Sequence, residues 1–140
     1  MTLNKSARYA LYAALEMALA GSRPVTVAGV AVDYGIPPTA LAKVLQQLVR
    51  SGIATGSRGV GGGYRLARAA AKISVLDVVS TFDPPRAAGQ CVAHETSSTC
   101  ARQDACSVRG LFDEVDELVR CTFASVTIET LAKRSRRRRI

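Results

Sequence analysis

The sequence predicts a mainly α-helical fold with a small β-hairpin wing: a winged helix-turn-helix followed by one long C-terminal helix. Two observations predict this class. Three segments with apolar residues at helical spacing precede a glycine-rich run that is flanked by two short apolar segments. A much longer helical pattern follows near the C-terminus. With 140 residues, the chain is long enough for one compact domain with an extension.

The first helix is expected over residues 5–20, where apolar side chains recur every three or four positions. Glu16 interrupts this apolar stretch, which argues against an export signal and favours a cytoplasmic protein. The four cysteines are then expected to be reduced. Residues 21–24, which include a glycine and a proline, end the helix.

Two more helices complete the predicted three-helix set. Residues 25–34 form the second, with Thr26 as its N-cap and Gly35 after its end. The third runs from about Thr39 to Ser51, after two prolines that the start of a helix tolerates. Its apolar residues share one face: Leu41, Val44, Leu45 and Leu48.

The next segment is expected to form the wing. Residues 53–55 and 64–66 read as short strands, and the run between them holds five glycines. This run does not match a dinucleotide fingerprint, because Tyr64 stands at the third glycine position, and it lacks the Gly-Lys pair of a phosphate-binding loop. In a winged helix-turn-helix the third helix usually enters the major groove of DNA, and the hairpin reaches an adjacent groove.

The second half is expected to hold a fourth helix, a loop and the long helix. The fourth helix covers residues 73–82, with Ser74 as N-cap and Asp77 at the third helical position. Residues 84–106 form a polar, cysteine-bearing sensor loop. Residues 107–132 form the long helix, whose apolar stripe must be covered. We expect a homodimer through this helix, because a palindromic DNA site calls for a two-fold protein.

Charge is distributed unevenly along the chain. Residues 1–75 carry nine basic and two acidic side chains, whereas residues 76–132 carry four basic and nine acidic ones. Residues 133–140 add six basic side chains and are expected to be a disordered tail. The first half is therefore expected to bind a polyanion, and residues 1–83 are predicted to form a DNA-binding domain. A single histidine and the lack of a membrane-length apolar run argue against a multi-histidine enzyme and a membrane protein.

The candidate DNA contacts come from the third helix and the wing. Polar side chains outside the apolar face suit phosphate and base contacts, and a wing arginine suits the narrow minor groove. The candidates are Thr39, Ala40, Lys43, Gln47 (or Gln46) and Arg50 from the helix, and Arg58, Gly59 and Tyr64 from the wing.

Three cysteines form the candidate sensor site. Cys91, Cys100 and Cys106 lie within sixteen residues, whereas Cys121 would lie roughly 22 Å from Cys106 along a continuous helix. We therefore expect Cys121 to be a buried helix residue outside the site. His94 can supply a fourth ligand to the three thiolates. The spacing alone leaves an iron–sulphur cluster, a zinc site and a thiol switch open.

The chain resembles the Rrf2 family of bacterial winged-helix regulators over almost its whole length, the arginine tail excepted. The resemblance rests on three motifs and on three cysteines that precede a long helix. The motifs are Arg8-Tyr9-Ala10-Leu11, Ser57-Arg58-Gly59-Val60-Gly61-Gly62-Gly63-Tyr64-Arg65-Leu66 and Ile73-Ser74-Val75-Leu76-Asp77-Val78-Val79. The resemblance implies a homodimer, formed by the long helices, that binds palindromic double-stranded promoter DNA.

The resemblance also implies roles for individual residues. In many members, three loop cysteines hold a 2Fe-2S or 4Fe-4S cluster whose state tunes DNA binding. The positions that match these ligands are Cys91, Cys100 and Cys106. The positions that match base-reading residues or the wing arginine of relatives are Thr39, Ala40, Lys43 and Arg58.

The chain departs from the family pattern at the fourth ligand. Arg109 stands where IscR-like members have a ligand histidine, and Arg8 stands where NsrR-like members have an acidic residue. The candidates within this chain are His94 and Asp104, beside a residue of the partner subunit or an external small molecule. The sequence thus predicts a cytoplasmic, dimeric DNA-binding regulator, not an enzyme, that senses redox state, iron or nitric oxide through a loop cluster. The alternative is a cluster-free regulator with a thiol–disulfide switch or a structural zinc site.

Overall fold

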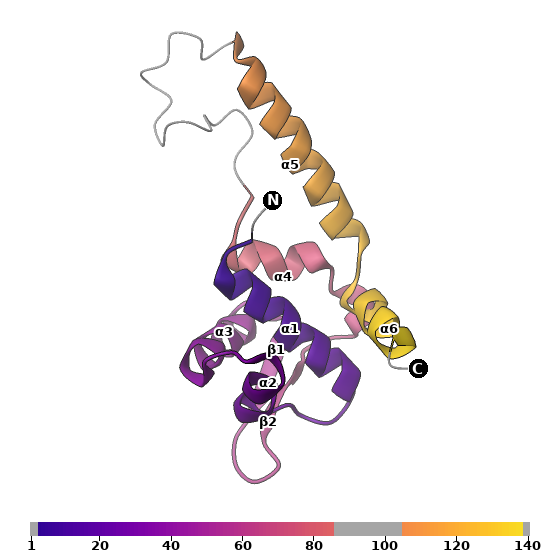
Figure 1. Ribbon diagram of the computed structural model, residues 1–140. Coiled ribbons are helices and arrows are strands. Elements are labelled where there is room, and N and C mark those ends of the chain that lie inside the picture. Colours follow the sequence, from indigo (N-terminus) through magenta and orange to yellow (C-terminus); the bar gives the residue numbers. More distant parts are fainter. Residues whose placement is uncertain (1–2, 86–104, 139–140) are drawn as a thin grey trace. The chain divides into compact units, whose positions relative to one another are not determined.

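The computed structural model describes residues 3–85 and 105–138 (Figure 1). The chain divides into two compact units, the first formed by residues 1–84 with 123–140 and the second by residues 85–122. The elements in chain order are α1 (Lys5–Ala20), α2 (Val27–Tyr34), α3 (Pro38–Arg50), β1 (Ala54–Ser57), β2 (Gly63–Leu66), the 3₁₀ turn η1 (Ala70–Lys72), α4 (Val75–Phe82), α5 (Ser107–Ser125) and α6 (Ile128–Arg138).

The predicted fold class is confirmed: the described residues are mainly helical and hold one antiparallel hairpin, β1 with β2. Two predicted helix caps are also confirmed. Thr26 Oγ1 accepts a hydrogen bond from Gly29 N (3.0 Å), and Gly35 ends α2 with a left-handed φ of 62°. Ser74 and Asp77 form a reciprocal capping box, and α4 begins two residues later than predicted.

α1 lies at the centre of the first unit, where it contacts α3, α4 and α6. Its inward face consists mostly of alanines, which let the neighbouring helices pack closely. The fully buried residues of this face are Ala7, Ala10, Ala13, Ala14 and Met17. α3 buries the four apolar residues predicted from its pattern, but it starts at Pro38 with no side-chain cap. Thr39 therefore lies inside the first turn and does not cap the helix.

The wing is a hairpin anchored to the segment between α1 and α2. Each strand has four residues, and the pairing reaches Ser57 and Gly63, further into the glycine run than predicted. Val25 N donates to Tyr64 O (2.9 Å), and Tyr64 N donates to Val25 O (2.8 Å). A Cβ at Gly63 would lie 2.4 Å from Val25 O, so only glycine allows this crossing.

The predicted helix over residues 107–132 is not continuous. α5 ends at Ser125, and α6 begins at Ile128 after a break of two residues. The apolar stripe continues across the break because the residues there pack against the core of the first unit. The apolar pattern of the sequence therefore gives no sign of the boundary between α5 and α6.

Backbone hydrogen bonds fix the break against the start of α4. Val75 N donates to Val126 O (2.8 Å), and Ile128 N donates to Ile73 O (2.9 Å). Thr127 Oγ1 accepts a hydrogen bond from the backbone N–H three residues later (3.1 Å) and so caps α6. The chain therefore re-enters the first unit at a defined point.

The first unit takes in more of the chain than the predicted domain over residues 1–83. Ile128 is fully buried in its core, Ala132 is buried, and Phe123, Val126 and Leu131 pack against it. Residues 123–138 thus cover apolar side chains of the first unit that residues 3–84 alone would leave exposed to solvent.

The predicted disordered tail over residues 133–140 is instead helical as far as Arg138. Ile128, Leu131 and Ala132 bury one side of α6, so the helix is held against the first unit. Lys133 Nζ pairs with Glu129 Oε2 (3.2 Å) on its outer side. The backbone of residues 134–138 is therefore helical and continuous with the packed part of α6.

α5 has no buried residue. Its large apolar side chains recur every three or four positions, and each is between 41% and 69% exposed. This exposed apolar stripe consists of Val108, Leu111, Phe112, Val115 and Leu118. A stripe of this kind on a helix marks a surface for another protein chain.

Candidate nucleic-acid interface and cysteine site

α3 presents a polar stripe to solvent. Its members follow at spacings of four, three and four residues, which places them along one side of the helix. The stripe consists of Thr39, Lys43, Gln46 and Arg50, all exposed. Gln47 and Ala40 are half-buried at its edge, so Gln46 shares the stripe and Gln47 does not.

Three cations of α3 and the wing lack acidic partners among the described residues. Lys43, Arg50 and Arg58 are exposed, and none forms an ion pair within residues 3–85 and 105–138. Unpaired cations on a helix and a neighbouring hairpin give a positive surface that attracts the phosphates of DNA.

The tip of the wing carries Arg58 and Gly59, both exposed, and Gly62 N donates to Gly59 O (3.0 Å) to close the turn. Tyr64 differs from these residues, since it is half-buried and its side chain packs against the core. Tyr64 therefore holds the base of the wing, and its contact with DNA stays a prediction.

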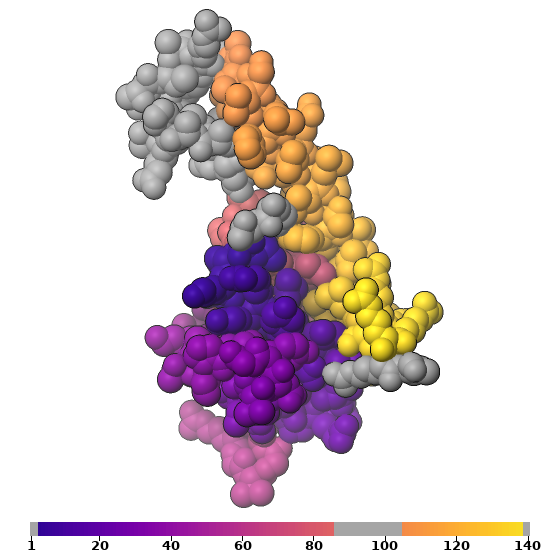
Figure 2. Space-filling model, in the orientation of Figure 1, coloured from indigo at the N-terminus to yellow at the C-terminus, as the bar shows by residue number. Residues whose placement is uncertain are grey.

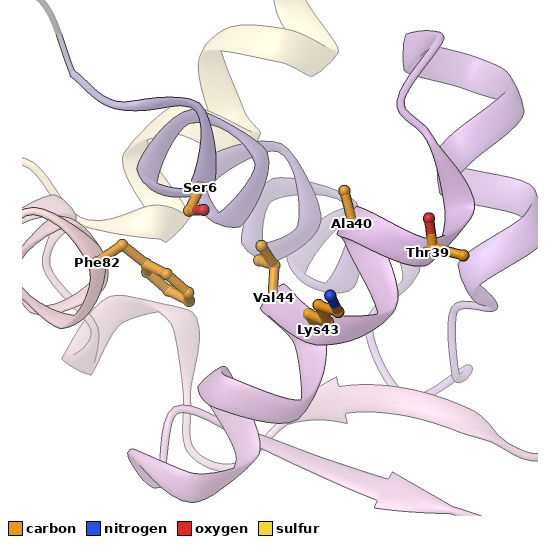
Figure 3. Close-up of a pocket in the computed structure, with 6 residues that line it drawn as sticks. All are labelled: Ser6, Thr39, Ala40, Lys43, Val44 and Phe82. Carbon is orange, nitrogen blue, oxygen red and sulfur yellow. The ribbon is translucent and has the colours of Figure 1, made fainter.

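A hollow of ≈ 290 Å³ lies beside the first turns of α3 (Figure 3). Figure 3 shows the Phe82 ring turned toward Val44 and Lys43 across it. Ser6, Thr39 and Lys43 bring polar groups to its wall. The sequence signals did not include Ser6 and Phe82, because residues this far apart in the chain meet only in the folded protein.

The end of α4 is tied to the start of α1. Asn4 Nδ2 donates to Phe82 O (2.8 Å), and Asn4 N donates to Asp83 Oδ2 (2.9 Å). Asn4 Oδ1 also accepts from Ala7 N (2.8 Å) and caps α1. The point where the chain leaves the first unit toward the cysteines is thus bonded to α1 and lies beside α3.

Most of the predicted cysteine site lies outside the described residues: Cys91, His94, Cys100 and Asp104 belong to residues 86–104. Cys106 is described and half-buried, directly before α5. Its Sγ accepts a hydrogen bond from Arg109 N (3.4 Å). This bond places the thiol at the N-terminus of α5, and the role of Cys106 as a cluster ligand stays a prediction.

Cys121 is exposed, and the prediction that it is buried is wrong. Its Sγ donates to Glu117 Oε1 (3.4 Å). The hydrogen bonds from Arg120 and then from Cys121 hold the pKa of Glu117 below its ordinary value. α5 is continuous from Ser107 through Cys121, which supports the separation of Cys121 from Cys106.

The part of the chain that the structure describes holds no group of three or more metal-binding side chains. Within that part, no helix combines the length and the apolar character that a bilayer span needs.

A comparison with protein families matches residues 3–134 to Rrf2, an iron-dependent transcriptional regulator. The chain is 33% identical over 133 residues to the putative HTH-type transcriptional regulator BadM of Rhodopseudomonas palustris, covering 95% of this chain and 82% of BadM. It is 32% identical over 134 residues to the HTH-type transcriptional regulator IscR of Xenorhabdus nematophila, covering 95% of this chain and 80% of IscR. The fold is similar to that of CymR, the global cysteine regulator of B. subtilis, with a TM-score of 0.77 and 22% identity, covering 95% of this chain and 97% of CymR.

Proposed function

This chain belongs to the Rrf2 family of DNA-binding transcriptional regulators, which are not enzymes. From that premise we propose that it is a cytoplasmic homodimer that binds palindromic promoter DNA. We propose further that its DNA binding responds to an iron–sulphur cluster held by the cysteines of the loop over residues 84–106. DNA binding is supported chiefly by the polar stripe of α3, which lies beside the wing. The cations of the stripe and of the wing tip form no ion pair among the described residues. α3 enters the major groove, and Arg58 at the tip of the wing reaches an adjacent minor groove.

Lys43→Ala is expected to weaken binding to a duplex selected from random sequences by about tenfold or more, because a lost base or phosphate contact costs about 1 to 3 kcal/mol. Fluorescence anisotropy at fixed salt measures this loss. Lys72→Ala removes the same charge from η1, outside the polar stripe, and should stay within about twofold of the wild type. Equal losses in both variants would show that the affinity depends on overall charge and not on α3.

The exposed apolar stripe of α5 supports the homodimer. A second copy of this chain offers the same stripe, and the two can cover each other around a two-fold axis. The palindrome then has one half-site for each α3. The sequence predicts dimerisation through one helix over residues 107–132. Because that helix is broken, the proposed interface is limited to α5, residues 107–125.

The residues that would hold the cluster are Cys91, Cys100 and Cys106, with His94 or Asp104 as the fourth ligand from this chain. Such a cluster, when bound, supplies reversible one-electron chemistry and sensitivity to oxidants and nitric oxide. Phe82 lines the hollow beside α3, and Asn4 bonds the end of α4. Phe82 and Lys43 line the same hollow, so a change in the loop that moves the end of α4 would act beside Lys43.

Cys106→Ser is expected to abolish the visible absorption of anaerobically purified protein, because a hydroxyl is a poor replacement for a thiolate ligand. Iron, sulphide and zinc assays accompany the spectra. Cys121→Ser is the matched control and should keep the colour, since Cys121 lies far along α5. A colourless wild type that contains zinc, or that changes DNA affinity only with disulfide formation, would favour the cluster-free alternative. Equal DNA affinity of coloured and colourless protein would contradict the sensing role.

A further inference from the structure

The C-terminal end of α6 carries four arginines in five residues: Arg134, Arg136, Arg137 and Arg138, here called the arginine cluster. Ser135 is half-buried between them, and the inner residues of α6 pack against the core. Figure 2 shows α6, in yellow, at the surface of the first unit. The cluster therefore belongs to the same folded unit as α3 and the wing.

No described acidic side chain compensates the charge of the arginine cluster. All the cluster side chains are exposed, and none forms an ion pair in the described part of the chain. The acidic residue of α6, Glu129, already pairs with Lys133. Four guanidinium groups so close together repel one another, and a polyanion relieves that repulsion. Each guanidinium can bind a phosphate through two hydrogen bonds.

The arginine cluster is separate from the α3 surface. α6 packs against α1 and η1, whereas α3 packs against α1, α2, α4 and β1. Figure 1 shows α1 between α3 and α6. The α3 stripe and the cluster therefore lie on two different helices, on either side of α1.

We propose that the arginine cluster binds the phosphate backbone of duplex DNA, independently of sequence, outside the base pairs that α3 and the wing read. The proposal rests on the proposed DNA-binding function. The phosphates come either from DNA that flanks the operator or from a second duplex, and both offer the same chemistry. Binding of this kind releases counterions and so steepens the dependence of affinity on salt.

The test compares two duplexes that share one selected operator: a core duplex limited to the protected base pairs, and an extended duplex with about ten more on each side. The variant Arg136→Gln/Arg137→Gln/Arg138→Gln removes three charges per chain. Arg136→Lys/Arg137→Lys/Arg138→Lys keeps them and is the matched control. Affinity is measured by fluorescence anisotropy across a salt series, and capture of a second, labelled random-sequence duplex by the core complex is measured separately.

On the extended duplex, the glutamine variant is expected to bind about tenfold or more weakly at low salt, with a salt slope smaller by about two units or more. On the core duplex it should match the wild type. A loss confined to the extended duplex assigns the phosphates to flanking DNA, and a loss of second-duplex capture assigns them to another duplex.

The proposal is overturned if the glutamine variant changes neither measurement, if it loses as much on the core duplex as on the extended one, or if the lysine variant loses as much as the glutamine variant. Failure of the proposed function gives a different result, because the wild-type protein then selects no operator. Lys43→Ala provides the opposite pattern, with its loss present on the core duplex.

Discussion

Glutamate at both Leu111 and Leu118 is expected to leave the protein monomeric at micromolar concentration and to weaken its binding to a palindromic duplex by about a hundredfold or more. These side chains are 58% and 69% exposed in the single chain and lie on the apolar stripe of α5. In the dimer they would be covered, and a carboxylate there would be buried without a partner. The monomer then loses the gain in affinity that comes from two linked half-sites.

Sedimentation equilibrium and fluorescence anisotropy on the same preparations measure both effects. Gly110→Glu with Ala124→Glu adds the same charge at exposed positions off the stripe, and a Cβ at Gly110 meets nothing within 4 Å. This control should stay dimeric and bind DNA as the wild type does. A double glutamate variant that still sediments as a dimer would remove α5 as the interface. Circular dichroism checks that both variants keep their helices.

Ile128→Ala is expected to lower the free energy of unfolding by about 3 kcal/mol, within the range of about 2 to 5 kcal/mol for such truncations of buried residues. Ile128 is fully buried in the core of the first unit, and its backbone N–H bonds to Ile73 O. At about 4 to 8 °C per kcal/mol, the melting temperature falls by about 12 to 24 °C.

Urea titration and thermal melts followed by circular dichroism measure the loss at Ile128. Val60→Ala is the control, because Val60 lies at the exposed tip of the wing and its truncation should change stability by about 0.5 kcal/mol or less. If the two variants were equally stable, α6 would not be part of the cooperative unit that holds α3.

The first half of the fold could be predicted because its signals are local. Thr26, Gly35 and Ser74 mark helix ends through bonds to residues three or four positions away. The glycine run marks the wing for the same reason, since a tight hairpin needs backbone conformations that glycine supplies. The strand limits were less accurate, because the anchor at Val25 lies far away in the sequence.

The C-terminal part could not be predicted so well, because its structure depends on distant contacts. The apolar period runs through Val126, Thr127 and Ile128 without interruption, although the backbone there leaves the helix to bond with residues near α4. The one local signal for the start of α6 was Thr127, a residue type that commonly caps helices, and the sequence prediction did not use it. Cys121 was expected to be buried because cysteines commonly are, but its side chain is exposed, like most of α5.

The candidate DNA surface was largely visible in the sequence, since the buried face of α3 defines the opposite polar stripe. The choice between Gln46 and Gln47 needed the helix to be placed against the core. The hollow and the bonds from Asn4 to the end of α4 join residues nearly eighty positions apart, and no periodic pattern encodes such contacts.

The position of Ile128 in the core also sets the order in which the protein can mature on the ribosome. α3 and the wing leave the exit tunnel before α6 does, and the core behind them lacks Ile128 and Ala132 until α6 has emerged. The nascent chain therefore presents α3 and the wing on an incomplete core while residues 84–125 are being made. We therefore expect a chain that stops short of α6 to be less stable than the full chain, because its core lacks the buried side chains of Ile128 and Ala132.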